Sequence, residues 1–94
     1  MMQFDEQHKI ALISIIEIVL MSGGNIKYNL VTSKLNSLYD CSIRDCCEKP
    51  EYLKTVLKDV YKKDYNSIIE EIKLHLRDLA NEKDIADFLK IMES

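Results

Sequence analysis

The sequence predicts an all-α fold, with four longer helices and a short C-terminal helix in a single domain of residues 1–94. Two observations support this class. Only two glycines and one proline occur in the chain, which is rich in helix formers such as Leu, Ile, Lys and Glu. Apolar residues also recur at helical spacing, and no stretch alternates with a period of two for long enough to predict a strand. With 47% hydrophobic and 31% charged residues, the composition is that of a globular domain.

The first predicted helix begins after Asp5, a residue type favoured at the N-cap, and runs to about Met21. Gly23 and Gly24 then end it. A helix that is apolar on nearly all sides must be covered on nearly all sides, by other helices of the chain or by a dimer partner. Its apolar positions are Ile10, Leu12, Ile13, Ile15, Ile16, Ile18, Val19 and Leu20.

The apolar run from Ile10 to Met21 also raises the question of a membrane or export signal. The run is shorter than the stretch of about 20 apolar residues that a bilayer requires, so we expect no membrane partner. A secretory signal peptide is an alternative interpretation. Such a peptide has a basic start, whereas Asp5 and Glu6 precede this run. We therefore interpret the segment as a core helix.

The second predicted helix takes Asn25 as its N-cap and runs from Ile26 to about Leu38. Its expected core stripe is Tyr28, Val31, Leu35 and Leu38. The periodicity then stops, so residues 39–49 are predicted to form a loop.

The third predicted helix has Pro50 at its first position, where the missing N–H costs nothing, and runs to about Lys62. The fourth is expected to be capped by Asp64 and to run from Tyr65 to about Ala80. A break at Asn81 and a new cap at Asp84 predict the short last helix, whose buried residues are Ile85, Phe88, Leu89 and Met92.

The net charge of −3 argues against a dedicated nucleic-acid-binding protein, which is usually basic. Lys54, Lys58 and Lys62 nevertheless lie at i, i+4 and i+8, so they share one face of the third helix. This stripe is a candidate anion patch, and a nucleic-acid-binding transcriptional regulator is an alternative function. The default interpretation is a solvated helix face, because Glu51 and Asp59 lie close by.

Three cysteines, Cys41, Cys46 and Cys47, form the pattern C-x4-C-C. An odd number leaves at least one thiol outside any internal disulfide, and the pattern predicts a reducing, cytoplasmic location. A zinc site needs four ligands, and His8 and His75 lie far away in sequence, so we predict no metal. A redox pair of Cys41 and Cys46 remains an alternative. Our preferred interpretation places these two in the core and lets Cys47 point elsewhere.

The segment around these cysteines is the least generic part of the chain. Asp45 is expected to accept backbone N–H bonds in the loop, and Glu51 to lie in the first turn of a helix. Tyrosines flank the loop, and their combination of ring and hydroxyl is common at protein interfaces. No catalytic motif is recognisable, so we predict a non-enzyme without a cofactor. The candidate binding residues are Tyr39, Cys41, Asp45, Cys46, Glu51 and Tyr52.

The pattern C-x3-D-C-x3-P-E-Y-L at residues 41–53, preceded by Tyr39 and followed by Val56-Leu57 and Tyr65-x-x-Ile68-Ile69, resembles a known family. The chain is similar to the Nitrosopumilus output domains, small uncharacterised helical domains of ammonia-oxidising archaea. The resemblance extends from the first helix to Phe88-Leu89. It implies an output or sensor module in signal transduction or transcriptional regulation, with no established ligand for the motif residues.

The sequence therefore predicts a non-enzymatic regulatory or protein-interaction domain. We expect it to bind another protein, or itself as a homodimer, through the first helix or the loop of tyrosines and cysteines. The alternatives are the nucleic-acid-binding regulator that uses the lysine stripe and a thiol redox or metal sensor that uses Cys41 and Cys46.

Overall fold

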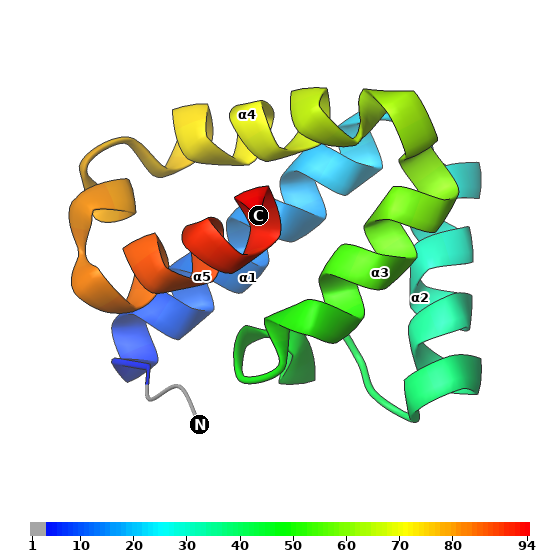
Figure 1. Ribbon diagram of the computed structural model, residues 1–94, viewed down its shortest axis with the longest axis horizontal. Coiled ribbons are helices and arrows are strands. Elements are labelled where there is room, and N and C mark those ends of the chain that lie inside the picture. Colours follow the sequence, from blue (N-terminus) through cyan, green and yellow to red (C-terminus); the bar gives the residue numbers. More distant parts are fainter. Residues whose placement is uncertain (1–3) are drawn as a thin grey trace.

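Helices joined by short turns account for most of the chain, as the computed structural model shows (Figure 1). It describes residues 4–94, apart from the side chain of Cys46. The α-helices are α1 (Glu6–Ser22), α2 (Asn25–Tyr39), α3 (Pro50–Tyr61), α4 (Tyr65–Leu76) and α5 (Lys83–Glu93). Three short 3₁₀ segments lie between them: η1 (Asp45–Cys47), η2 (Lys62–Asp64) and η3 (Arg77–Asn81). No strand occurs in residues 4–94, so the all-α prediction is confirmed.

Helix α1 runs through the middle of the molecule and packs against α2, α4 and α5 (Figure 1). Helix α3 packs against α2 on one side and α5 on the other, so α2 lies at one end of the molecule. All five α-helices contribute to one core, which explains why a chain of this size can bury a continuous apolar interior. Its largest fully buried side chains are Phe88, Leu12, Ile16, Leu20, Leu35, Leu53, Leu57, Ile72, Ile85 and Met92.

The start of α1 follows the prediction. Asp5 is the N-cap, and its carboxylate accepts hydrogen bonds from the backbone N–H groups of Gln7 and His8 at 2.9 and 3.2 Å. The helix ends at Ser22, before Gly24 with its φ of 112°. A positive φ of this kind is available to glycine at little cost. Gly24, rather than the expected Asn25, therefore occupies the N-cap position of α2, and Asn25 is already helical.

One prediction about burial in α2 is wrong, and the structure narrows one about α1. Leu38 was expected in the core but is 62% exposed, because the buried stripe of Val31 and Leu35 continues to the half-buried Tyr39 instead. For α1, the other helices of the chain do not cover it on nearly all sides, which leaves the predicted alternative of a partner. Ile10, Ile18 and Met21 are each about half exposed, at 50%, 52% and 51%.

The second half of the chain differs from the prediction mainly at helix ends. Pro50 is at the first position of α3, as expected. Asp64 occupies the N-cap position of α4, which begins at Tyr65 as expected, but its side chain makes no cap hydrogen bond. Helix α4 ends at Leu76 rather than Ala80 because Arg77 takes a φ of 53°. The last helix has 11 residues against 12 in α3 and in α4, so it is hardly shorter than they are.

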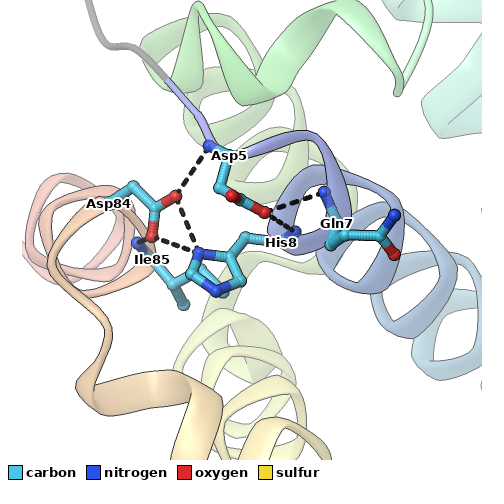
Figure 2. A network of polar contacts seen from close by, with 5 residues as sticks. All are labelled: Asp5, Gln7, His8, Asp84 and Ile85. Atoms are coloured by element: carbon cyan, nitrogen blue, oxygen red, sulfur yellow. Dashed lines mark hydrogen bonds and ion pairs between the residues drawn. The ribbon is translucent and has the colours of Figure 1, made fainter.

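Asp84 was predicted to cap the last helix, but Glu82 occupies that position. The Asp84 carboxylate instead joins α5 to the start of α1, as Figure 2 shows. It accepts hydrogen bonds from the backbone N–H of Asp5 at 3.1 Å and of Ile85 at 2.8 Å. It also lies 3.0 Å from Nδ1 of His8.

Candidate functional site

The predicted binding loop connects α2 to α3 and is held by its own polar contacts. Asp40 ends α2 in the left-handed conformation, with a φ of 52°. Asp45 then closes a tight turn, because its carboxylate accepts hydrogen bonds from the backbone N–H of Ser42 at 3.0 Å and from the Ser42 hydroxyl at 3.2 Å. The prediction that Asp45 accepts a backbone N–H in the loop is confirmed. Such a contact stabilises the turn and leaves less of this carboxylate for a ligand.

Two predicted site residues, Tyr39 and Tyr52, come together across the loop. Tyr39 ends α2 and Tyr52 lies in the first turn of α3, and their rings stack with centroids 4.2 Å apart and an interplanar angle of 3°. The Lys49 ammonium lies 5.6 Å from the Tyr52 ring centroid. Both tyrosines are half-buried. Because each ring covers a face of the other, the pair serves first as a packing contact that fixes α3 on α2.

The cysteines are arranged differently from the preferred prediction. Cys47, expected to point away, is the thiol in the core, with 1% of its surface exposed. Burial raises the pKa of Cys47 to about 11, the nearby Lys9 lowering it only in part. A thiol with this pKa is almost entirely protonated at neutral pH and is a poor nucleophile. Cys41 is half-buried against the same core, and the side chain of Cys46 lies outside the described residues.

The remaining predicted residues lie on the surface of α3. Glu51 is exposed in the first turn, where its charge suits the helix dipole as expected. Of the lysine stripe, Lys54 donates to the Ser94 hydroxyl at 2.8 Å and Lys58 lies 5.3 Å from the Tyr65 ring centroid. Lys62 ends the helix with a φ of 51°. Two of the three ammonium groups therefore have intramolecular partners.

The described residues bear on two predictions, that the chain binds no metal and that it has no membrane partner. Among the described side chains, no three His, Cys, Asp or Glu residues gather closely enough to hold a metal ion. None of the described helices has the length and apolar character needed to cross a bilayer.

A shallow depression lies between the loop and the α1–α2 pair, with a volume of about 310 Å³. Cys41 and Arg44 contribute from the loop, Glu17 from α1, and Tyr28 from α2. The Tyr28 hydroxyl donates a hydrogen bond to Glu17 at 3.0 Å, and burial together with this bond raises the pKa of Tyr28. Of the predicted binding residues whose side chains the structure describes, only Cys41 lines the depression. These described residues are therefore not gathered into one site.

A further surface feature involves α1, which was predicted above as a possible binding element, and α2, which was not. Among the described residues, seven large hydrophobic side chains are exposed. Three are on α1 and three on α2, and only Leu74 lies elsewhere, on α4. Those on the two helices are Ile10, Ile18, Met21, Ile26, Leu30 and Leu38.

The same two faces carry no exposed charge. No charged residue between Ile10 and Tyr39 is exposed. The three that occur there are half-buried: Glu17 accepts from Tyr28, Lys27 lies over the Tyr61 ring, and Lys34 pairs with Asp59. We call the exposed residues of α1 from Ile10 onward and of α2 the hairpin surface.

A sequence signal for this surface exists. Only Glu17, Lys27 and Lys34 are charged from Ile10 to Tyr39, although charged residues make up 31% of the chain. The many apolar residues of the first helix indicate a buried helix. The scarcity of charged residues in both helices is the better indicator of a binding surface. Depletion of charge with retained apolar side chains is typical of the centre of protein interfaces.

Comparisons with models of known protein families, with curated proteins and with solved structures found no match.

Proposed function

We propose that this chain is a protein-interaction domain that binds its partner through the hairpin surface. The observation that carries the proposal is the concentration of exposed large hydrophobic residues on α1 and α2, with no exposed charge among them. Exposed apolar side chains gathered on a small part of a domain indicate a binding surface, whereas single scattered ones do not.

The charge distribution over the rest of the molecule supports the same choice of face. From α3 onward, exposed charged residues are frequent and include both signs, as in Glu51, Lys58, Lys63, Glu70 and Lys90. Such a surface is well solvated and costs free energy to bury. The hairpin surface is therefore the part of the molecule that a partner can cover at the least desolvation cost.

A regulatory role, as the output or sensor module that the family resemblance implies, is part of this proposal. It rests on the sequence resemblance alone, whose most specific part is the pattern at residues 41–53. An interaction domain without a catalytic centre would perform such a role by binding and releasing another protein. The loop would then act indirectly, because the Tyr39–Tyr52 stack fixes the end of α2 against α3.

Site-specific photocrosslinking in cells that express the protein tests the proposal. A photoreactive phenylalanine analogue replaces Ile18 on α1, Leu30 on α2 or Leu74 on α4, the last as a control of comparable exposure outside the hairpin surface. We expect protein adducts from positions 18 and 30, with the chain itself or with another protein, and far fewer from position 74. Equal adduct yields at all three positions, or none, would contradict the proposal.

A further inference from the structure

Helix α2 carries a narrow stripe of four exposed residues whose side chains are large in its N-terminal half and small in its C-terminal half. Ile26, Leu30, Ser33 and Ser37 are spaced at i, i+4, i+7 and i+11, so they lie on one line along the helix. The N-terminal half of the stripe has two large apolar side chains, of which Ile26 is 80% exposed. The C-terminal half has two serines, which leave room for a neighbour.

We infer that α2 is a homodimerisation helix, and that a second copy of the chain packs its own α2 antiparallel against this stripe. The inference rests on the proposed function and names the partner. In an antiparallel pair centred between residues 31 and 32, Ile26 faces the second copy's Ser37 and Leu30 faces its Ser33. Each large side chain then meets a small one, which is the arrangement that lets facing helices interdigitate.

A parallel pair fits the same stripe poorly. It would place Ile26 against Ile26 and Leu30 against Leu30, and it would leave serine facing serine in the other half. The large pairs would hold the helices apart where the small pairs need them close. The size pattern therefore selects the antiparallel arrangement, which also has the two-fold symmetry common among homodimers.

The charges around the stripe favour a second copy over a charged partner. In a two-fold interface the same surface meets itself, so any exposed charge near the axis would meet a like charge. The exposed residues of α2 carry none. Asn25, Asn29 and Asn36 beside the stripe have neutral side-chain amides that both donate and accept hydrogen bonds, so Asn29 of one copy can pair with Asn36 of the second copy, which lies close to it along the antiparallel pair.

The two lysines of α2 are held away from the stripe. The Lys27 ammonium lies 5.2 Å from the Tyr61 ring centroid, and Lys34 forms an ion pair with Asp59, both on α3. Packing against α1 and α3 fixes the inner side of α2, and Figure 1 shows α2 at the end of the molecule. A second copy can therefore approach the outer side without displacing another element. One 15-residue helix spans about 22 Å, so we expect a weak, reversible dimer.

Sedimentation equilibrium up to millimolar concentration, under reducing conditions, tests the inference with a charge-pair design. Ile26→Glu should weaken dimerisation at least tenfold, and Ser37→Lys should weaken it less. Neither change should destabilise α2 itself, because the new acidic side chain lies in the first turn of the helix and the new basic one in the last, where the helix dipole favours these charges. Leu74→Glu, at a position 69% exposed on α4, is the matched control and should leave the dimer unchanged.

The double variant Ile26→Glu/Ser37→Lys distinguishes the two orientations. In the antiparallel pair each new carboxylate faces a new ammonium of the other copy, so dimerisation should recover roughly tenfold relative to Ile26→Glu. In a parallel pair like charges meet, and the double variant should be the weakest. A wild-type chain that stays monomeric, a dimer insensitive to Ile26→Glu, or a double variant without recovery would overturn the inference. Photocrosslinks from position 30 to a different protein would in that case still support an interaction domain.

Discussion

His8 and Asp84 connect the first turn of α1 to the first turn of α5, because Nδ1 of His8 lies 3.0 Å from both carboxylate oxygens of Asp84. The hydrogen bond to Asp84 raises the pKa of His8. Burial opposes this effect, and the negative charges of Asp84, Asp5 and Glu82 add to it, so the pKa is raised on balance. For Asp84, burial by itself would raise the pKa. The hydrogen bonds from His8 and from the backbone N–H groups of Asp5 and Ile85 outweigh it, so the pKa is lowered.

The pair should make stability depend on pH within a defined window. His8 has its pKa raised above 6.5, so its contribution is complete below about pH 6.5 and is lost as the pH rises through the raised pKa. Asp84 has its pKa lowered below 3.8, so its contribution is present above 3.8 and is lost as the pH falls through the lowered pKa. The stabilisation is therefore largest between about pH 4 and 6.5.

Thermal unfolding of the wild type and of His8→Ala from acid to alkaline pH measures this effect. The difference in Tm should be largest near pH 5 to 6, roughly the middle of the window, and should narrow toward pH 9. In an Asp84→Asn background the effect of His8→Ala should be small and nearly independent of pH. A difference in Tm that stays constant across the whole range would show that the ion pair contributes nothing.

Asp5 and Asp84 also show how far sequence reasoning reaches. Both are acidic residues before an apolar periodic run, and both were predicted as caps. Asp5 is one, with its carboxylate on the N–H groups of Gln7 and His8. Asp84 instead binds residues at the other end of the chain. The local sequence around the two residues looks alike. What distinguishes Asp84 is its partner His8, which lies 76 residues away and cannot be recognised from the neighbouring residues.

The candidate site was predictable to a similar extent. Helical periodicity predicts the buried stripes well, because it reports which residues share a face. It does not report whether a neighbour in the same chain covers that face, so it left open whether Ile18 on α1 is covered by the chain itself or by a partner. The role of Asp45 was predicted from turn chemistry, whereas the burial of Cys47 depends on the direction of one turn, η1, which has no periodic pattern.

The stack of Tyr39 on Tyr52 should couple α2 to α3 in stability. A double-mutant cycle with Tyr39→Ala and Tyr52→Ala, followed by urea unfolding, measures the coupling directly. We expect a coupling free energy of about 0.5–1.5 kcal/mol, because offset aromatic pairs contribute this much beyond the area they bury. Additive effects of the two substitutions on the free energy of unfolding would mean that the two rings do not stabilise each other. Each tyrosine would then again be a candidate binding residue by itself.

Cys47 should behave as a structural residue rather than a reactive one. With 1% exposure and a pKa of about 11, its thiol should react with a maleimide only when the protein opens, so labelling should accelerate with urea. Mass spectrometry of proteolytic fragments identifies the labelled cysteine. Rapid labelling of Cys47 in the native protein would contradict its buried position.

Replacing this thiol tests the same burial through stability. Cys47→Ser places a hydroxyl in an apolar core and should cost about 1–3 kcal/mol if the hydroxyl finds no partner. Cys47→Ala removes the sulfur without adding a polar group, so it should be the milder of the two. Equal stability of the serine variant and the wild type, measured by urea unfolding, would show that this position is not part of the core.

Tyr61 and Tyr65 provide a matched pair for the value of one buried hydrogen bond. The Tyr65 hydroxyl donates to the backbone carbonyl of Met92 at 2.6 Å, where the last turn of α5 leaves carbonyls without helical partners. The Tyr61 hydroxyl is buried and has no partner among the described residues.

Tyr65→Phe should therefore destabilise the protein by about 1–3 kcal/mol, since the Met92 carbonyl loses its partner. Tyr61→Phe should be neutral or stabilising, because it removes a hydroxyl whose burial is uncompensated. Urea unfolding of both variants compares them, and a larger loss from Tyr61→Phe than from Tyr65→Phe would contradict this assignment of the two hydroxyls.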